Sequence, residues 1–301
     1  MRLLVTRPLA QAVEAVRELR ARGVDAHALP LIGIEPLPEG DDGRADDRTD
    51  GREDGREESG CGPSVAALAA ELRRSRETLA ERRLAMFVSA NAVRHFLAAP
   101  GGMAWPPGTL AGSTGPGTTA ALRAAGVPQA CIREPAPQAE RLDSEALWQQ
   151  LRHLDWRGAS VLVVRGEGGR DWLADTLRAA GARVDFVAAY RRTLPRLDEE
   201  QTALLQAAQA HASGHAWHFS SSEAVHNLPR LAPGGGWRAS PALATHPRIG
   251  EAARAVGFAD VQVLAPGLAA LLHAWQRLQA DEGRPASAQA GEGPPIESRP
   301  L

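Results

Sequence analysis

An internal repeat is the feature that most constrains how this 301-residue chain can fold. Three kinds of short unit occur twice along the chain, in the same order. Residues 2–30 match 160–188, residues 87–93 match 219–225, and residues 115–126 match 246–257. A repeated series of units predicts two related halves, and the length also exceeds what one hydrophobic core usually organises. We therefore expect two similar domains with a ligand bound between them.

The repeated units alternate short apolar runs with amphipathic helical patterns. The strand-like runs are Leu3–Val5, Leu84–Val88, Val161–Val164 and Trp217–Phe219. Helices predicted over residues 11–22, 118–125 and 171–180 are each followed by a glycine, at Gly23, Gly126 and Gly181. A glycine just past a helix is the usual left-handed cap. Strands that alternate with helices predict parallel β-sheets, and therefore an α/β fold.

Two segments lack the composition of a folded core. Residues 39–60 hold ten acidic residues and four arginines, and the tail from about residue 280 is rich in Pro, Gly, Ser and Ala. Neither segment can bury enough apolar surface to offset the entropy that ordering costs. We expect residues 37–63 to form a disordered acidic insertion and residues 280–301 a disordered tail. The insertion is either a tolerated loop extension or a contact with another enzyme.

The charge of the remaining residues and the absence of lysine limit the possible chemistry. The whole chain has a net charge of -2, of which the insertion carries -6 and the tail -2, so the remainder carries +6. This mild basicity favours an anionic ligand but falls short of nucleic-acid binding. All 34 basic residues are arginine. A lysine Schiff base, a pyridoxal-phosphate site and a P-loop lysine are therefore excluded.

Other common chemistries also lack their motifs. Cys61 and Cys131 provide neither a disulfide framework nor the spacing of a zinc site. His211, His215 and His218 lie near one another without a metal motif, and the first two are expected in a loop. No Gly-x-Gly-x-x-Gly follows a predicted strand, which argues against NAD binding. No apolar run is long enough for a membrane span or a signal peptide, so we expect a cytoplasmic protein.

Hydroxyl side chains at predicted strand–helix junctions are candidates for binding an anion. Ser89 and Ser221 each follow an apolar strand and are expected to cap a helix. A helix start presents free backbone N–H groups that can hold a carboxylate or a phosphate. Thr118 opens another helix after a Gly-Pro-Gly turn. These residues either cap helices and nothing more, or form a shared anion site, which their equivalent positions favour.

A glycine-rich turn and a single tyrosine are the other candidates. Arg165 and Arg170 flank the turn, where Gly166 and Gly169 allow close backbone approach. Their guanidinium groups either bind an acid group or are simply exposed at a tight turn. Tyr190 is the only tyrosine in the chain. It is either a packing residue with a solvated hydroxyl or, if it faces a cleft, a hydrogen-bond donor to a leaving group.

Several short motifs occur in an order that resembles a known family. They are Leu4-Val-Thr-Arg-Pro8, Leu29-Pro-Leu31, Phe87-Val-Ser-Ala-Asn-Ala-Val93, Gly115-Pro-Gly-Thr-Thr119, Leu162-Val-Val-Arg-Gly-Glu-Gly-Gly-Arg170 and Val187-Ala-Ala-Tyr-Arg191. A second Phe-Ser-Ser-x-x-Ala-Val motif and a closing Ala-Arg-Ala-Val-Gly257 complete the series. In this order the motifs resemble the uroporphyrinogen-III synthases, over about residues 2–278 without the insertion.

The resemblance implies a fold of two flavodoxin-like α/β domains with parallel sheets, joined by a two-stranded connection. The first domain of such a protein is discontinuous. Applied to this sequence, residues 1–36 plus 192–279 form the first domain, and residues 64–189 form the second. The internal repeat does not by itself dictate this division.

The resemblance also implies an activity. The family converts linear hydroxymethylbilane into uroporphyrinogen III and water, inverting ring D during closure, with no cofactor and no metal. Because the azafulvene intermediate closes unaided to the wrong isomer, the enzyme mainly positions its substrate. The implied partner is this small polycarboxylate, with no nucleic acid, no membrane and a monomeric protein. Two alternatives remain: a non-catalytic tetrapyrrole-binding or regulatory module, and a two-domain binding protein for an anionic metabolite.

The roles of individual residues follow from the resemblance as well. Tyr190 matches the tyrosine thought to assist departure of the hydroxyl. The substrate-binding candidates are Thr6, Arg7, Ser89, Thr118, Arg165, Gly166, Gly169, Arg170, Ser221 and Ser222. For Thr6 and the arginines, substrate contact and a structural role both remain open. Val88, His246 and Ile249 depart from the family pattern, and the last two weaken the case for anion contacts from residues 246–250.

Overall fold

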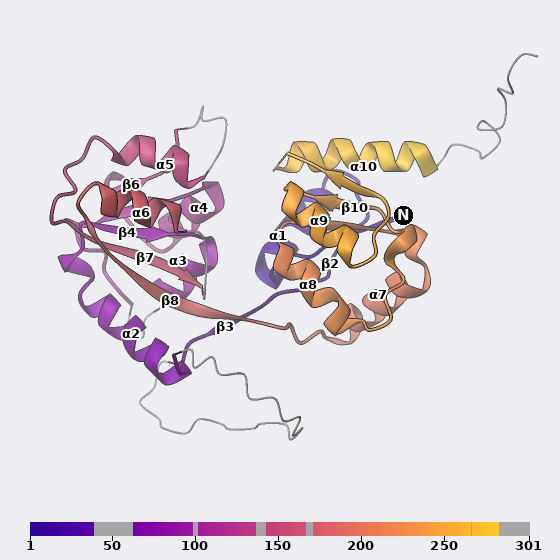
Figure 1. The fold of residues 1–301 in the computed structure, drawn as a ribbon, viewed down its shortest axis with the longest axis horizontal. Helices are drawn as coiled ribbons and strands as arrows, with labels where there is room; N and C mark the ends of the chain where they lie inside the picture. The colour runs from indigo at the N-terminus through magenta and orange to yellow at the C-terminus, as the bar shows by residue number, and fades with distance from the viewer. Residues whose placement is uncertain (39–62, 99–101, 137–142, 167–170, 266, 283–301) are drawn as a thin grey trace, which may run out of the picture. The chain divides into compact units, whose positions relative to one another are not determined.

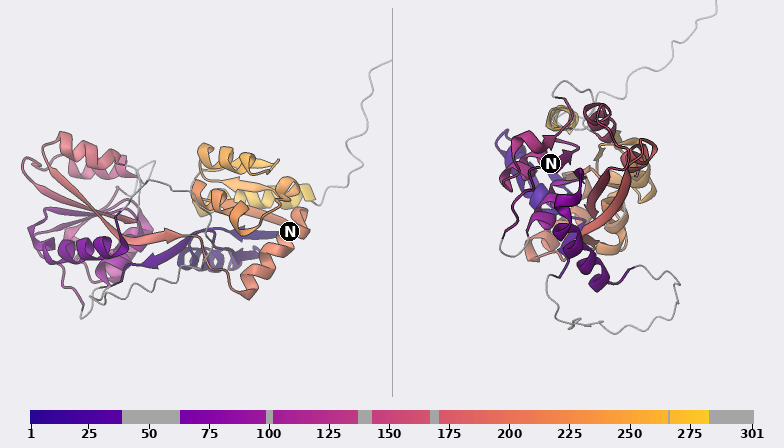
Figure 2. Two further views of the ribbon diagram at one scale, coloured as in Figure 1. Left: turned by 60° about the horizontal axis from the view of Figure 1, so that its bottom comes forward. Right: turned by 90° about the vertical axis from the view of Figure 1, so that its left-hand side faces the viewer.

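A computed structural model describes residues 1–38, 63–98, 102–136, 143–166, 171–265 and 267–282. The chain divides into two compact units (Figure 1). Unit 1 comprises Met1–Gly33 and Thr193–Leu301, and unit 2 comprises Ile34–Arg192. Each unit contains one β-sheet covered by helices, as the two further views show (Figure 2).

Unit 1 is built on a five-stranded sheet with the order β11-β10-β9-β1-β2. Its strands are β1 (Arg2–Val5), β2 (Ala26–Ala28), β9 (His215–Phe219), β10 (Ala242–Ala244) and β11 (Val261–Val263), and each neighbouring pair is parallel. The helices are α1 (Leu9–Arg20), α7 (Glu199–Ala210), α8 (Ser222–Leu231), α9 (Pro247–Ala255) and α10 (Leu268–Glu282). Leu3, Leu4 and Val5 have no exposed surface, as a central parallel strand covered on both faces requires.

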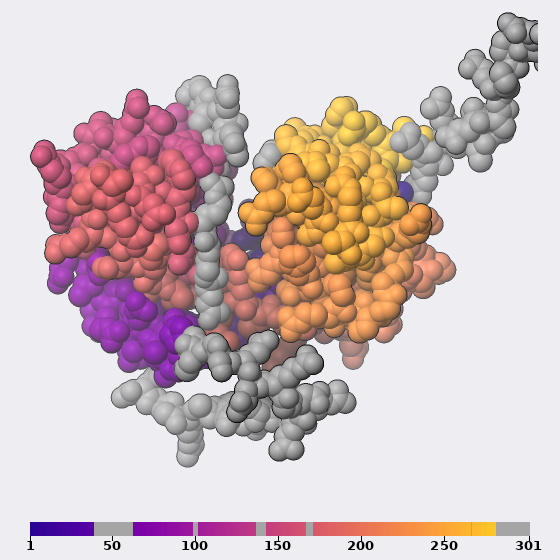
Figure 3. Space-filling view, in the orientation of Figure 1, coloured from indigo at the N-terminus to yellow at the C-terminus, as the bar shows by residue number. Residues whose placement is uncertain are grey.

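The two faces of this sheet bury different side chains. Leu3, Val5 and Ala216 pack with the apolar stripes of α1 and α10, and α10 also forms part of the outer surface of the unit (Figure 3). Because successive strand residues point to opposite faces, Trp217 and Phe219 lie on the other side. There they join Trp237 and Phe258 in a cluster of edge-on and stacked rings.

Unit 2 contains a six-stranded sheet with the order β3-β8-β7-β4-β5-β6. Its strands are β3 (Gly33–Pro36), β4 (Leu84–Phe87), β5 (Leu110–Ser113), β6 (Ile132–Arg133), β7 (Ser160–Gly166) and β8 (Arg183–Thr193). The helices are α2 (Val65–Glu77), α3 (Ala90–Leu97), α4 (Pro116–Ala124), α5 (Ser144–Leu151) and α6 (Trp172–Ala179). Short 3-10 helices lie at Leu79–Glu81 and Gln129–Cys131 in this unit, and at Ala212–Gly214 and Trp237–Ala239 in unit 1.

The two sheets share one topology, which explains the sequence repeat. Aligning β7–β8 with β1–β2, and β4–β5–β6 with β9–β10–β11, gives the same order of five strands in both units. In unit 1, read along the chain, this is the flavodoxin-like order 2-1-3-4-5. Unit 2 has a circular permutation of it, because its chain forms β4, β5 and β6 before β7 and β8. The strand pairs β4–β5, β4–β7, β5–β6 and β7–β8 are parallel. The predicted α/β class is therefore confirmed. The chain passes between the units along β3 and β8, which are neighbours in the sheet.

Most predicted strands and helices are present, with a few corrections at their edges. His215, which the sequence analysis expects in a loop, is instead the first residue of β9 and is buried. Leu37, placed within the acidic insertion, is buried in the core of unit 2, and α10 continues to Glu282, inside the expected tail. Residues 39–62 and 283–301 lie outside the described residues. None of the described helices is long and apolar enough to cross a membrane.

Candidate functional site

The predicted site residues of unit 1 lie where its strand order changes direction. The chain proceeds from β1 to β2 on one side of β1 and continues with β9 on the other, so the switch point lies between β1 and β9. Ligands of open α/β sheets bind outside the carboxyl ends of the strands at such a point. Thr6 and Arg7 follow β1 directly, and Ser221 follows β9. The topology therefore brings these three residues to one edge of the sheet.

Thr6 and Arg7 have different environments at this edge. The Thr6 hydroxyl is fully buried and donates to the backbone oxygen of His218 at 2.8 Å, so it ties β1 to β9. Arg7 is partly buried, and its Nε is a buried atom with no hydrogen-bond partner in the part of the chain that the structure describes. Burial lowers the pKa of the Arg7 guanidinium, and the charge of Glu14 opposes this shift. An arginine remains charged nonetheless, so Arg7 offers a cation to an anionic ligand.

His218 is a buried polar residue beside Thr6 that the sequence analysis did not propose for the candidate site. It is 5% exposed, and its Nδ1 is buried with no described residue as a hydrogen-bond partner. Burial, and secondly the charge of Arg7, lower the pKa of His218 to about 3. The ring is therefore neutral at neutral pH. The available signal was a histidine between two aromatic residues of a predicted apolar strand, Trp217 and Phe219. The sequence analysis considered this histidine only as a metal ligand, and no metal motif was present.

The two serines of unit 1 have the predicted position at a helix start. Ser221 is the N-cap of α8, and its Oγ accepts from the backbone N–H of Glu223 at 3.2 Å. Ser222 is the first residue of that helix. His246 caps α9 in the same manner, since its Nδ1 accepts from the N–H of Arg248. The matching turn of the repeat thus keeps a capping acceptor although its sequence departs from the family pattern.

Unit 2 has an equivalent switch point between β4 and β7. The chain runs from β4 to β5 on one side and from β7 to β8 on the other. Ser89 follows β4 and is the N-cap of α3, where its Oγ accepts from the N–H of Ala92 at 3.1 Å. Gly166 ends β7. These residues therefore occupy the edge that corresponds to Ser221 and Arg7 in unit 1.

A register shift brings Tyr190 to this edge. Along β7 and β8, Arg165 pairs with Ala188, whereas Gly166 pairs with Tyr190, so one extra residue on β8 forms a bulge. Bulges re-aim the side chains beside them. The Tyr190 hydroxyl lies 3.3 Å from Ser89 Oγ, within hydrogen-bond distance. Tyr190 itself is only 1% exposed and belongs to the core of the unit.

His95 of α3 is a second residue that the sequence analysis missed. Its ring centroid lies 5.6 Å from that of Tyr190 at an interplanar angle of 38°. Burial, followed by the charges of Arg94 and Arg76, lowers the pKa of His95. The imidazole is therefore neutral at neutral pH. No pattern of residues signals this contact, since it depends on how α3 packs on β8.

The remaining candidates are placed as follows. Thr118 is buried in the first turn of α4, and its N–H donates to the carbonyl oxygen of Gly115. Arg165 pairs with Asp171 at 2.6 Å and lies over the ring of Phe186 at 3.9 Å, so its guanidinium already has partners within unit 2. Gly169 and Arg170 lie outside the described residues.

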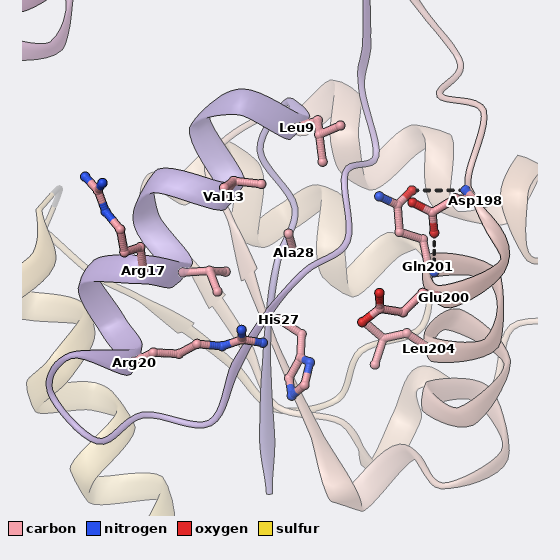
Figure 4. A pocket seen from close by; sticks show the side chains of 11 residues that line it. Leu9, Val13, Arg17, Arg20, His27, Ala28, Asp198, Glu200, Gln201 and Leu204 are labelled. Carbon is pink, nitrogen blue, oxygen red and sulfur yellow. Dashed lines mark hydrogen bonds between the residues drawn. The ribbon is translucent and has the colours of Figure 1, made fainter.

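A pocket of about 540 Å³ lies in unit 1 between α1 and α7 (Figure 4). Arg17, Arg20 and His27 occupy one side, and Asp198 and Glu200 the other. None of the predicted site residues that the structure describes lines it. Because its walls carry both signs of charge, this pocket does not select for a polyanion, and the switch points remain the better candidate sites.

Comparison with known proteins decides the family. A sequence model of the family described as uroporphyrinogen-III synthase HemD matches residues 61–272. The chain belongs to the uroporphyrinogen-III synthase family. The uroporphyrinogen-III synthase of Salmonella typhimurium strain LT2 is 31% identical over 206 residues, which cover 68% of this chain and 70% of that protein. The resemblance found in the motifs is thus confirmed.

Solved structures of uroporphyrinogen III synthases share the fold. A triple mutant of the enzyme from Thermus thermophilus superposes with a TM-score of 0.51 at 19% identity, covering 93% of this chain and 99% of that chain. The enzyme from Helicobacter pylori 26695 gives a TM-score of 0.54 at 14% identity, covering 92% and 100%. At these identities the similarity concerns the two-domain α/β fold alone.

Proposed function

We propose that the chain is a uroporphyrinogen-III synthase, a lyase that cyclises hydroxymethylbilane to uroporphyrinogen III and water with inversion of ring D. The observation that carries this proposal is the family match over residues 61–272, joined by a curated relative of that name. Its products feed porphyrin and heme biosynthesis. The switch-point residues supply chemistry that suits such a substrate.

A polycarboxylate substrate suits the hydrogen-bond donors at the two sheet edges. The helices capped by Ser89 and Ser221 begin at the carboxyl ends of central strands and direct free N–H groups and the positive end of a helix dipole outward. Arg7 adds a cation whose Nε has no hydrogen-bond partner among the described residues. Thr118 and Ser222 lie in first helical turns of the same kind. We infer that these groups bind substrate carboxylates and thereby orient the chain for closure.

Tyr190 is proposed to assist departure of the substrate hydroxyl. Its phenol is the only one in the chain, and its O–H can donate a hydrogen bond. It lies at the edge of unit 2 where the switch-point residues gather. Neutralising the leaving hydroxyl as water is the one step of this reaction that needs a proton donor. The remaining rate and isomer control come from positioning.

Product analysis tests the proposal. The purified protein is incubated with enzymatically generated hydroxymethylbilane, and the products are oxidised and resolved into isomers I and III. Isomer III above the buffer control supports the enzyme. Binding of the tetrapyrrole with isomer I alone would favour a binding or regulatory module, and a protein that binds no tetrapyrrole would favour a carrier of another anionic metabolite.

We further propose that the protein acts as a monomer in the cytoplasm, with no nucleic-acid or membrane partner. The mildly basic charge outside the insertion and the tail, which falls short of a nucleic-acid-binding surface, supports the absence of a nucleic-acid partner. Light scattering of the purified chain and localisation of a tagged copy are the corresponding measurements.

A further inference from the structure

We propose that Ser89 delivers the proton to the leaving hydroxyl and that Tyr190 acts through Ser89. This inference rests on the proposed synthase function and specifies the proton path within it. Tyr190 is 1% exposed, whereas Ser89 is partly exposed at the edge of the sheet. Their hydroxyl oxygens lie 3.3 Å apart. A substrate at this edge therefore meets Ser89 first, with the phenol directly behind it.

The hydrogen bonds of Ser89 set the direction of transfer. A serine hydroxyl has one proton to donate and two lone pairs to accept with. The backbone N–H of Ala92 occupies one lone pair at 3.1 Å. When the Tyr190 hydroxyl donates to the other, both lone pairs are filled and the serine proton points away from Tyr190 and from the helix. Among the described residues no acceptor then remains for the Ser89 proton, which is available to an incoming group.

The position at a helix start supports the charge that such a transfer leaves behind. Ser89 is the N-cap of α3, so the positive end of the helix dipole and the free N–H groups lie beside its oxygen. Negative charge on the Tyr190–Ser89 pair is stabilised there. The equivalent serine of unit 1, Ser221, also caps a helix but has no tyrosine behind it. The relay is therefore specific to unit 2.

The transfer balances in protons and charge. As the C–O bond of the substrate hydroxymethyl group breaks, the Ser89 proton passes to the departing oxygen, which leaves as water. The Tyr190 proton passes to Ser89, and the phenolate and the azafulvenium cation form together. Ring D then bonds through its substituted α-carbon to the azafulvenium carbon, which gives a spiro intermediate, and the older bond from that α-carbon to its bridging methylene breaks. The released methylene bonds to the free α-carbon of ring D. As the pyrrole regains aromaticity, this carbon loses its proton, which returns through Ser89 to Tyr190.

A double-mutant cycle tests the relay through the initial rate of isomer III formation. Ser89→Ala and Tyr190→Phe are each expected to lower this rate on the order of 10-fold to 100-fold, the equivalent of one hydrogen bond to a charged group. Because both residues serve one path, the rate of the double variant Ser89→Ala/Tyr190→Phe is expected to lie within about 2-fold of the rate of the slower single variant. If the rate loss of the double variant equals the product of the two single losses, the relay is overturned.

Further variants separate proton transfer from helix capping. Ser89→Thr keeps a hydroxyl and is expected to retain most of the rate. Ser89→Asn keeps the cap but replaces the hydroxyl with an amide, which does not accept the Tyr190 proton while giving up its own, and it is expected to be as slow as Ser89→Ala. Ser64→Ala is the matched control, since Ser64 caps α2 of the same unit through the N–H of Ala67. It is expected to keep the wild-type rate. Full activity of Ser89→Asn would overturn the relay.

Solvent isotope effects give a readout that a purely structural serine would not change. In single-turnover reactions across mixtures of H2O and D2O, two protons moving together give a curved dependence of rate on deuterium fraction. Tyr190→Phe leaves one moving proton and is expected to give a straight line. A straight line for the wild type would overturn the relay while leaving the synthase function intact. A wild-type protein that forms no isomer III would overturn both.

Discussion

A Cβ atom placed on Gly166 would lie 2.7 Å from Cε2 and 2.8 Å from Cζ of Tyr190. Both distances are shorter than real Cβ atoms show, so only glycine fits beside the ring. The ring cannot swing away easily, because Tyr190 is 1% exposed and packed in the core of unit 2. Gly166 and the bulge opposite it therefore hold the phenol toward Ser89. The glycine of this turn has a positional role that does not require it to touch a ligand.

Gly166→Ala is accordingly expected to displace Tyr190 and to slow isomer III formation. Overpacking in a filled core costs about 1–3 kcal/mol of unfolding free energy, so the variant should fold but be less stable. Urea unfolding and the rate assay measure the two effects. Gly108→Ala is the control, because no atom lies within 4 Å of a Cβ at that position. A Gly166→Ala variant with the wild-type rate would show that the Tyr190 position is not critical.

Tyr190→Phe is expected to lower turnover substantially without unfolding the protein. The substitution removes only the hydroxyl, whose hydrogen bond to Ser89 is worth about 1 kcal/mol of stability. The ring packing against Gly166 and His95 remains. Circular dichroism and urea unfolding establish that the fold is kept, and isomer III formation reports the role of the phenol. Wild-type rates in this variant would contradict that role but not the fold.

The fold was largely predictable because its signals are local. Alternating apolar runs and amphipathic helices reflect burial on two faces of a parallel sheet, and each predicted helix in the repeat ends at a glycine with positive φ: Gly23, Gly126 and Gly181. The repeat was also readable, since both units use one strand order. The boundaries of the ordered segments were less predictable. Leu37 directly precedes the charged segment in sequence but packs into the core of unit 2.

The site was only partly predictable, because its geometry depends on register and packing. The capping serines could be predicted from the strand–serine–helix pattern. The bulge that places Tyr190 opposite Gly166 leaves no pattern in the sequence, since one inserted strand residue resembles any other. The neutral state of His218 and the contact of His95 with Tyr190 arise from burial among segments distant in sequence. Effects of this kind can be recognised only from the three-dimensional structure.

Arg7→Gln is expected to raise the KM for hydroxymethylbilane with a smaller effect on kcat. The Arg7 guanidinium is proposed to bind a substrate carboxylate, and one charged hydrogen bond is worth about 1.5–3 kcal/mol, or roughly a 10-fold or greater loss in affinity. Arg2→Gln, at the opposite end of β1 and paired with Asp25 at 3.8 Å, is the control and should leave KM unchanged. An equal KM for both variants would remove Arg7 from the binding residues.

His218 is expected to make unit 1 less stable in mild acid. Its pKa is about 3 in the folded protein, below the value of about 6.5 in an unfolded chain, so the unfolded state binds a proton first as the pH falls. The folded state therefore keeps its full advantage above about pH 6.5 and loses it progressively toward pH 3. At pH 5 the loss is about 2 kcal/mol by linkage. Urea unfolding at pH 7 and pH 5 measures it.

His218→Met isolates this contribution from those of other titrating groups. The repeat places Met86, a buried residue of β4, at the equivalent position of unit 2, so a methionine suits this type of strand site. The variant cannot take up the proton, and its unfolding free energy should fall less between pH 7 and pH 5 than that of the wild type, by about 2 kcal/mol. Identical pH dependence in the two proteins would mean that His218 is hydrated or protonated in the folded state.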